Sequence, residues 1–311
     1  MRWLAALLLV TPLTGCAATA ADDGRILVTA GFYPLAWVAE RVGGSTVDVV
    51  GLTDPGVEPH DIEPTFARTV ALARADLVVV EHGLQPAIDA AVEQNAEGRV
   101  LDVVDVVDLR HAEDDNEHAD EEHADEGDHD HGDVDPHFWL DPALLAEVAD
   151  AVADELTGLD PQHAASYAAN AQALRSELTD LDQAFTSGLA DCERHVIVSS
   201  HDAFGYWAKY GIEVAPVTGL TPDAEPTPAG IARLQQLIGN EGITTVFSEK
   251  LASPELTDSL AHDLGLRTAV LDPVEGLVEG GASDDSTDDY LSLMRENLTA
   301  LEEANGCSLS S

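Results

Sequence analysis

Basic residues are scarce in this sequence. Only 14 Lys and Arg stand against 59 Asp and Glu, which gives a formal net charge of −45. This balance argues against a nucleic-acid partner, because binding to a phosphate backbone depends on positive charge. Aromatic residues make up only 5% of the chain, so an aromatic stacking surface for sugars or bases is not expected either. The acidity suits a cation ligand, but it is spread along the chain and identifies no ligand by itself.

Long apolar runs are also missing, so no transmembrane helix is expected in the mature chain. The N-terminus has Arg2, the short apolar run Leu4–Val10 and then the tetrapeptide Leu13–Cys16, which is typical of a secretory signal. The tetrapeptide resembles a bacterial lipobox. We therefore expect residues 1–15 to be a signal peptide, Cys16 to be lipidated, and residues 16–24 to form a tether to the cell membrane. The alternative is an ordinary cleaved signal that discards Cys16.

Cysteine is rare as well, with three in the chain. If Cys16 carries lipid, Cys192 and Cys307 remain, and two thiols in an exported protein are expected to pair because the compartment is oxidising. The bridge would close a loop of about 115 residues and join the start of the C-terminal half to the end of the chain. Two separate free thiols are the alternative.

Short β-branched runs alternate with segments of helical spacing, which predicts parallel sheets flanked by helices. The expected strands are Ile26–Ala30, Val47–Gly51, Leu77–Glu81, Val100–Val104, His195–Ser200, Glu213–Val217, Thr244–Ser248 and Thr268–Leu271. The expected helices are Leu35–Val42, Thr65–Arg74, Gln85–Gln94, Pro142–Leu156, Phe204–Tyr210, Pro228–Asn240, Pro254–Leu264 and Asp289–Ala304.

One helix is expected to be unusually long. From Pro161 to Leu189 the sequence has helical spacing, no interior proline and a single late glycine. A coiled-coil segment is the alternative to an interdomain strut. We expect an α/β protein with an N-terminal lobe at 25–158, one long rigid linking helix at 159–190 and a C-terminal lobe at 191–311. Each lobe would hold a mostly parallel sheet flanked by helices, with the ligand in the cleft between them.

A histidine-rich acidic segment at residues 111–135 interrupts the first lobe. Five of the 12 histidines fall within 21 residues, and acidic side chains surround them. Imidazole binds zinc, copper and nickel well, so the segment is a candidate for weak metal binding. Its polarity predicts a loop, and a solvated acidic linker is the alternative. The five histidines are His111, His118, His123, His129 and His131.

Four further residues lie just beyond the carboxyl ends of expected strands or in the loops after them. Ligands of open α/β sheets gather there, so two facing lobes could bring the four together. Three imidazoles and one carboxylate would form a tetrahedral shell for a metal ion. A lone histidine after a strand is a weak signal, and His82 in VVVEHG fits the same pattern. The four candidates are His60, His137, His201 and Asp272.

The order of several motifs resembles one family. PHDIEPT, DPHFWLDP, SSHDAFGYWAKYGI, TPDAEPTP and FSEKLASPEL followed by VLDPVEGL are similar to the metal-binding lipoproteins of bacterial zinc/manganese ABC importers, across nearly all of the mature chain. The resemblance implies two α/β lobes joined by one long helix, with a single metal ion between them. It places the ligands on His60, His137, His201 and Asp272.

Two glutamates are expected to assist this site. Glu249, in the FSE motif, matches a family position near the metal. Glu58 precedes Pro59 and His60 where relatives often have small residues, so it could add an oxygen directly or through water. Manganese members often have glutamate at the position of His201, and imidazole is the softer ligand, so the resemblance implies a zinc-type member. The long histidine-rich loop is also typical of zinc members.

The implied function is capture of Zn²⁺ outside the membrane and its delivery to a permease driven by a cytosolic ATPase. The chain has no P-loop motif, so ATP hydrolysis would come from a partner. We expect a monomer, anchored by lipid, that is not an enzyme, because HExxH and G-x-S-x-G motifs are missing and a fourth protein ligand would close the open position of a catalytic zinc. A manganese- or iron-binding importer component, and a surface adhesin or zinc buffer, are the alternatives.

Overall fold

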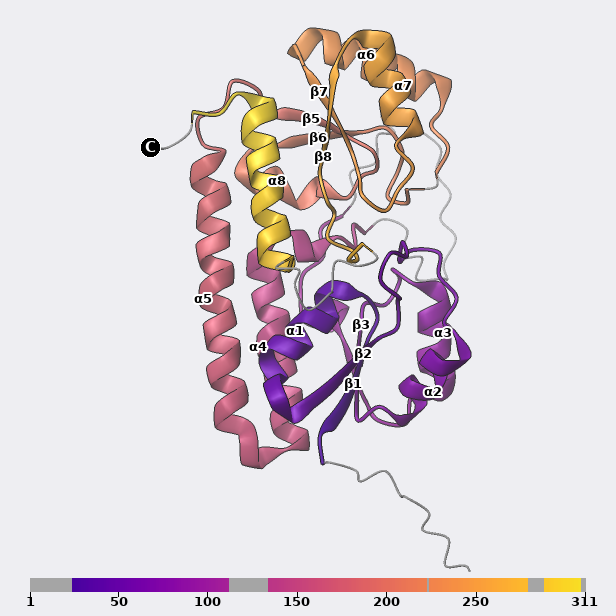
Figure 1. The fold of residues 1–311 in the computed structure, drawn as a ribbon, viewed down its shortest axis with the longest axis vertical. Coiled ribbons are helices and arrows are strands. Elements are labelled where there is room, and N and C mark those ends of the chain that lie inside the picture. Colours follow the sequence, from indigo (N-terminus) through magenta and orange to yellow (C-terminus); the bar gives the residue numbers. More distant parts are fainter. Residues whose placement is uncertain (1–23, 112–133, 223, 279–287, 309–311) are drawn as a thin grey trace, which may run out of the picture.

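Two four-stranded parallel sheets lie one above the other along the length of the molecule (Figure 1). The computed structural model describes residues 24–111, 134–222, 224–278 and 288–308. The strand order is β2-β1-β3-β4 in one sheet and β6-β5-β7-β8 in the other, so the two lobes repeat the same topology. In each sheet the second strand in sequence lies on one side of the first strand (β1 or β5), and the later strands lie on its other side. Such a switch point opens a crevice at the carboxyl ends of the strands.

The N-terminal sheet is built from short β-branched strands that are largely buried. All four residues of β3, LVVV, are inaccessible or nearly so, which is why the run has no polar alternation. Helix α2 begins after Thr65, whose hydroxyl accepts a hydrogen bond from the Arg68 N–H. The elements are β1 (Ile26–Ala30), α1 (Tyr33–Gly43), β2 (Val47–Gly51), α2 (Phe66–Arg74), β3 (Leu77–Val80), α3 (Pro86–Asn95) and β4 (Arg99–Asp102).

The C-terminal sheet repeats this arrangement with its own helices. Helix α8 starts at a reciprocal cap in which Asp289 and Ser292 bond each other's backbone N–H groups. The elements are β5 (Val196–Ser199), the 3₁₀ helix η5 (Phe204–Tyr210), β6 (Glu213–Pro216), α6 (Pro228–Glu241), β7 (Thr245–Ser248), α7 (Glu255–Leu264), β8 (Arg267–Val270) and α8 (Tyr290–Asn305).

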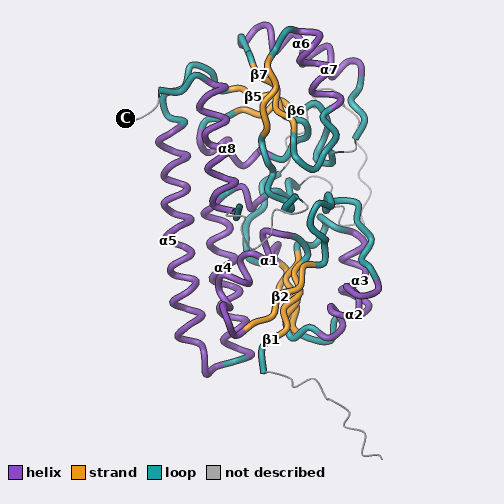
Figure 2. Tube along the Cα trace, viewed as in Figure 1, coloured by secondary structure: helices purple, strands orange, loops and turns teal. Residues whose placement is uncertain are grey.

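A helical layer runs beside both sheets (Figure 2). Helix α4 (Pro142–Leu159) turns through a short 3₁₀ segment into α5 (Ala164–Gly188), whose 25 residues span about 38 Å. The buried residues of α5 recur at alternating steps of four and three, which gives one apolar stripe facing α4 and α8. These residues are Tyr167, Ala171, Leu174, Leu178, Leu181 and Phe185. Helix α5 therefore serves as the long connector between the lobes.

The lobes also share a hydrophobic core. One cluster of buried side chains runs from Val28 of β1 to Leu301 of α8 without a break between the lobes. Trp37 of α1 packs against Tyr290 of α8 with ring centroids 4.9 Å apart, and Trp207 Nε1 donates a hydrogen bond to the Leu140 carbonyl at 3.1 Å. The contact between lobes is thus held by packed aromatic side chains as well as by α5.

The predicted fold class is confirmed, and the differences are local. Strand β4 ends at Asp102, two residues before the expected end, because the Asp102 side chain caps a 3₁₀ turn by accepting from the Val104 N–H. The long helix begins at Ala164, since Pro161–His163 form a 3₁₀ turn. No helix among the described residues is both long and apolar enough to cross a membrane.

The predicted domain boundaries, 25–158, 159–190 and 191–311, stay a prediction. The expected signal peptide and Cys16 lie outside the described residues, as does most of the tether. So do four of the five histidines of the acidic loop. The fifth, His111, forms an isolated antiparallel bridge with Val134 at the base of that loop.

The predicted pairing of Cys192 with Cys307 is confirmed, and the disulfide closes a separation of 115 residues. Replacing both cysteines by serine should lower the free energy of unfolding by about 2–4 kcal/mol, because the unfolded chain is no longer constrained by the bridge. Urea unfolding of the double variant measures this. The reduced wild-type protein is the control and should match it; an unchanged midpoint in the double variant would contradict the expectation.

Candidate metal centre

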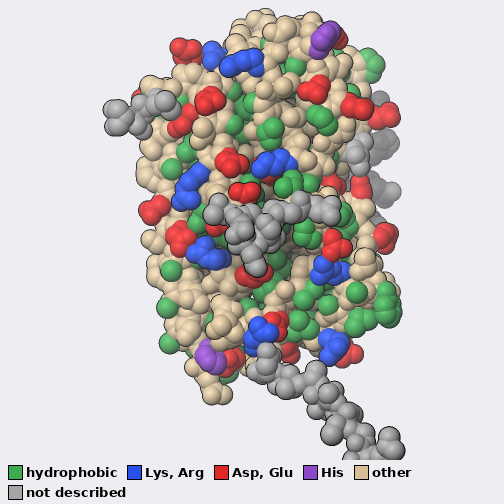
Figure 3. Space-filling view, viewed as in Figure 1, with side chains coloured by type: hydrophobic (Ala, Val, Ile, Leu, Met, Phe, Trp, Pro, Cys, Tyr) green, Lys and Arg blue, Asp and Glu red, His purple; other side chains and the backbone are tan. Residues whose placement is uncertain are grey.

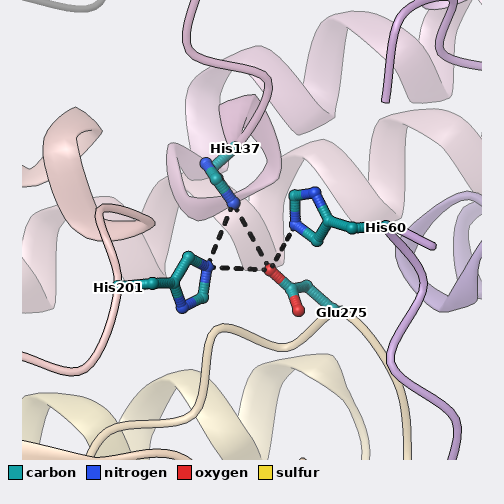
Figure 4. A group of neighbouring side chains, drawn as sticks. All are labelled: His60, His137, His201 and Glu275. Atoms are coloured by element: carbon teal, nitrogen blue, oxygen red, sulfur yellow. Dashed lines mark hydrogen bonds and ion pairs between the residues drawn. The ribbon is translucent and has the colours of Figure 1, made fainter. Parts of the chain in front are cut away.

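Four buried side chains that could hold a metal ion converge between the lobes (Figure 4). His60, His137, His201 and Glu275 each offer one ligand atom, and these atoms all lie within 4.8 Å of one another. The side chains are 5% exposed or less. Histidine is correspondingly sparse on the face of the molecule shown in Figure 3.

The shared topology of the lobes brings these residues together. His60 lies in the loop after β2, and His201 follows β5 directly. Glu275 follows β8, and His137 caps the 3₁₀ helix η3 (Phe138–Leu140) that leads into α4. Loops at the carboxyl ends of two facing parallel sheets therefore supply three of the four groups, as the switch-point rule predicts.

The distances match a tetrahedral metal shell. Glu275 Oε1 lies 3.4 Å from the Nε2 atom of each of the three histidines. The Nε2 atoms of His137 and His201 are also 3.4 Å apart. In a tetrahedral zinc site with metal–ligand distances of roughly 2.0–2.1 Å, neighbouring ligand atoms lie about 3.3–3.4 Å apart. Four of the six donor pairs thus have the spacing of a tetrahedral zinc site, and His60 Nε2 lies within 4.8 Å of the other two nitrogens.

Two of these atoms have no hydrogen-bond partner in the described part of the chain. They are His60 Nε2 and Glu275 Oε1, both fully buried. Leaving buried polar atoms without a hydrogen bond is costly, so most of them in folded proteins have a partner. A cation between the four groups would satisfy both atoms at once.

Two outer carboxylates orient the imidazoles. Asp135 Oδ1 accepts from His137 Nδ1 at 2.8 Å, and Glu249 Oε2 accepts from His201 Nδ1 at 2.6 Å. Each carboxylate also accepts the backbone N–H of its own histidine. Holding Nδ1 in this way turns Nε2 toward the centre and makes it a better ligand. Glu249 therefore lies where the sequence predicts, beside the site, and Asp135 is an additional partner.

Glu58 contacts the site from its more exposed side. Both of its oxygens accept from the His60 N–H at 3.1 Å, and Oε1 lies 3.8 Å from His60 Nε2. The Glu58 side chain is 21% exposed, more than any of the four central groups. Burial raises the pKa of Glu58, and His60 partly offsets this effect.

Glu275 and the histidines shift one another's pKa values. Burial raises the pKa of Glu275, but the three imidazoles outweigh burial and hold the pKa well below its usual range. Burial lowers the pKa of His201, yet the hydrogen bond to Glu249 and the negative charges of Glu249 and Glu275 outweigh it and raise the pKa to about 10. Asp135 and Glu275 likewise raise the pKa of His137 against the effect of burial. Without metal, an ionised Glu275 therefore faces a protonated His201 at neutral pH.

The fourth group differs from the sequence prediction. The structure places Glu275 with the three histidines, whereas Asp272 is engaged elsewhere. Asp272 Oδ1 accepts from the Val274 N–H at 2.9 Å, and Oδ2 pairs with Lys250 Nζ at 3.1 Å. His82, which the strand-end pattern could not separate from the others, lies away from the centre beside Asp89.

Sequence reasoning missed Glu275 and Asp135. A repeated pattern could have pointed to Asp135, because Glu58-Pro59-His60 and Asp135-Pro136-His137 both place a carboxylate two residues before a histidine. Both carboxylates accept the backbone N–H of that histidine. Glu275 lies three residues after Asp272 in the VLDPVEGL motif, and spacing alone does not choose between the two.

The sequence matches the model of one known protein family over most of its length. The family model described as zinc-uptake complex component A, periplasmic (ZnuA), matches residues 28–304. The chain belongs to the ZnuA family. The family resemblance inferred from the sequence motifs is thereby confirmed.

Three relatives of this ZnuA-family chain illustrate the match. The zinc-binding lipoprotein AdcA of Streptococcus pneumoniae is 31% identical over 94% of this chain, which spans only 58% of AdcA's length. Its Zn(II)-bound crystal structure has a TM-score of 0.74 at 27% identity, over 91% of this chain and 58% of that one. The high-affinity zinc uptake system protein ZnuA of Bacillus subtilis is 32% identical, over 93% of this chain and 90% of the relative.

The third relative is the laminin-binding protein Lmb of Streptococcus agalactiae. Its crystal structure, described as a bifunctional protein with adhesin and metal-transporting activity, has a TM-score of 0.76 at 26% identity. The match covers 90% of this chain and 99% of Lmb. The ZnuA-type fold therefore occurs in relatives with more than one stated activity.

Metal affinity should rise steeply with pH. Protons on His137 and His201 must leave before a metal binds, and their pKa values lie above the ordinary imidazole value of about 6.5. Fewer protons have to be displaced as the pH rises, so the proton on His201 alone should make the association constant grow by about one order of magnitude per pH unit between roughly pH 7 and 9. The sequence alone predicts that the affinity changes at a lower pH, near the ordinary imidazole pKa. Chelator competition across this range measures it.

The variant E249Q tests the cause of this pH dependence. Removing the Glu249 charge lowers the pKa of His201, so the dependence should become shallower above pH 8. E255Q, at an exposed glutamate of α7, is the matched control and should keep the wild-type slope. A pH-independent affinity in the wild-type protein would contradict a metal-free centre with a protonated His201.

Proposed function

We propose that this chain captures Zn²⁺ outside the cytoplasmic membrane and delivers it to the permease of an ABC importer, driven by a cytosolic ATPase. The observation that carries the proposal is the set of four buried donor atoms, three of them imidazole nitrogens that each lie 3.4 Å from Glu275 Oε1. Membership of a zinc-uptake family and the names of AdcA and B. subtilis ZnuA support the same cargo.

We propose His60, His137, His201 and Glu275 as the ligands of this cargo, with Glu249 and Asp135 orienting two of them. Three neutral imidazoles favour zinc over manganese, because manganese prefers oxygen ligands. Four protein donors close the coordination shell, whereas a catalytic zinc keeps one position open for water. The proposed role is therefore binding and transport of the ion, without catalysis on it.

A role as adhesin is the second candidate, and the similarity to Lmb favours it. The two roles are compatible, since an adhesive surface does not need the buried centre. A manganese- or iron-binding component remains the alternative for the cargo. The histidine-rich loop, outside the described residues apart from its base, is proposed to concentrate zinc weakly near the protein.

Competitive titration with zinc and manganese tests the cargo and the ligands. The wild-type domain should bind one zinc ion far more tightly than manganese. H201A and E275Q should each lose more than the roughly 10- to 100-fold typical of changes in outer partners. H262A, at a side chain that is 89% exposed on α7, is the matched control and should bind zinc normally.

Deleting residues 111–133 completes this test. The tight site should survive the deletion, and only the weak additional binding should be lost. Manganese binding as tight as zinc binding would assign the chain to the manganese-type members. Zinc binding that disappears with the loop would refute the buried centre as the main site.

We propose further that Cys16 carries lipid, which anchors the protein to the cell membrane on its extracytoplasmic side. C16S should abolish incorporation of a labelled fatty acid and move the protein from the membrane fraction to the soluble fraction. The double variant of Cys192 and Cys307, which removes the other two cysteines, is the control and should stay labelled. Labelled C16S protein would show that the lipid is attached to another residue.

A further inference from the structure

The turn that carries Glu275 contains a strained residue. Val274 has φ of +58°, and it is the one non-glycine residue with positive φ in the described ranges. A branched Cβ makes this region unfavourable, so the surrounding structure must hold the residue there. Val274 is also fully buried. The backbone preference of the chain therefore opposes the conformation that aims Glu275 at the histidines.

Asp272 and Asn297 hold one side of this turn. Asp272 Oδ1 accepts from the Val274 N–H at 2.9 Å, which closes the turn on the strained residue. The Asp272 N–H donates to Asn297 Oδ1 at 2.8 Å, and Asn297 Nδ2 donates to the Asp272 carbonyl at 2.7 Å. Asn297 lies on α8 and is buried, so this pair ties the turn to a rigid helix.

Trp139 holds the other side, from the opposite lobe. Its Nε1 donates to the Pro273 carbonyl at 2.7 Å, and its own carbonyl accepts from the Tyr290 hydroxyl. Trp139 is fully buried and stands two residues after His137. The hydrogen bond to Pro273 thus connects the segment of His137 directly with the segment of Glu275.

We propose that Asp272, together with Asn297 and Trp139, is a positioning group that keeps the strained turn in place and so sets Glu275 at 3.4 Å from three imidazoles. This inference rests on the proposed metal binding. Both carboxylate oxygens of Asp272 are already engaged, by Val274 N–H and by Lys250, so Asp272 acts on the ion through Glu275. Losing the hydrogen bonds that hold this turn releases Glu275 and speeds loss of the metal ion.

The test measures zinc dissociation into a strong chelator by stopped flow. D272A should dissociate zinc about 5- to 30-fold faster than wild type, since it loses the hydrogen bond that closes the turn. In an E275Q background the same change should add little, because the residue through which Asp272 acts is already altered. The visible absorption of the Co²⁺-loaded D272A protein should resemble that of Co²⁺-loaded E275Q.

Two further variants separate hydrogen bonding from charge. D272N keeps an oxygen that can accept from Val274, so it should recover most of the wild-type dissociation rate. K250M removes the ion-pair partner that Asp272 shares with the exposed Glu296 and leaves the hydrogen bond to Val274 in place, so it should dissociate zinc as wild type does. If D272A does not fold, D272N still tests the proposal. An amide can replace a carboxylate that acts through a hydrogen bond, whereas a carboxylate that binds the ion directly would lose its charge.

Two outcomes overturn the positioning role. In the first, D272A speeds zinc dissociation as much in the E275Q background as in wild type. In the second, D272N loses zinc as fast as H201A does. Failure of the underlying metal function has a different signature. In that case the wild-type protein, and not only the Asp272 variants, would fail to retain zinc.

Discussion

The burial of one carboxylate among three imidazoles is the constraint on which the rest of this structure depends. A buried charge is tolerated only when it is paired and hydrogen-bonded, and Glu275 has no other cation among the described residues within reach. His201 supplies positive charge by holding a proton, and Glu249 stabilises that proton from outside. Asp135 accepts from His137 Nδ1 in the same way. Without a metal ion, the proton on His201 therefore supplies part of the positive charge that a bound cation would bring.

The interface between the lobes keeps this arrangement in position. A core that continues from β1 to α8, the packed rings of Trp37 and Tyr290 and the 25-residue helix α5 all resist a wide separation of the lobes. Preformed donor distances lower the cost of ordering the site when the ion binds. Because each distance to Glu275 Oε1 is 3.4 Å, a shift of about an ångström in one loop is enough to spoil the tetrahedral shell. Release by a small local movement follows more naturally from this architecture than release by hinge opening.

The limits of sequence reasoning are visible in two neighbouring residues. Continuous β-branched runs such as LVVV and the regular apolar stripe of α5 predict the sheets and the connector, because burial on both faces or along one stripe leaves a direct pattern. Histidines after strand ends are predicted on the same grounds. The choice between Asp272 and Glu275 has no such pattern, since both carboxylates belong to one turn. It depends on the positive φ of Val274, which a β-branched residue gives no reason to expect.

The two carboxylate-Pro-His segments show how one local pattern serves two purposes. The short Asp135 side chain bonds both the backbone N–H and Nδ1 of His137, so it fixes the ring from the side away from the centre. Glu58 is one methylene longer, and its carboxylate lies 3.8 Å from His60 Nε2, the nitrogen that faces Glu275. Glu58 is also more exposed than the four central groups, at 21% against 5% or less. The pattern therefore orients the ring at His137, whereas at His60 it places a partly exposed carboxylate beside the nitrogen that faces Glu275.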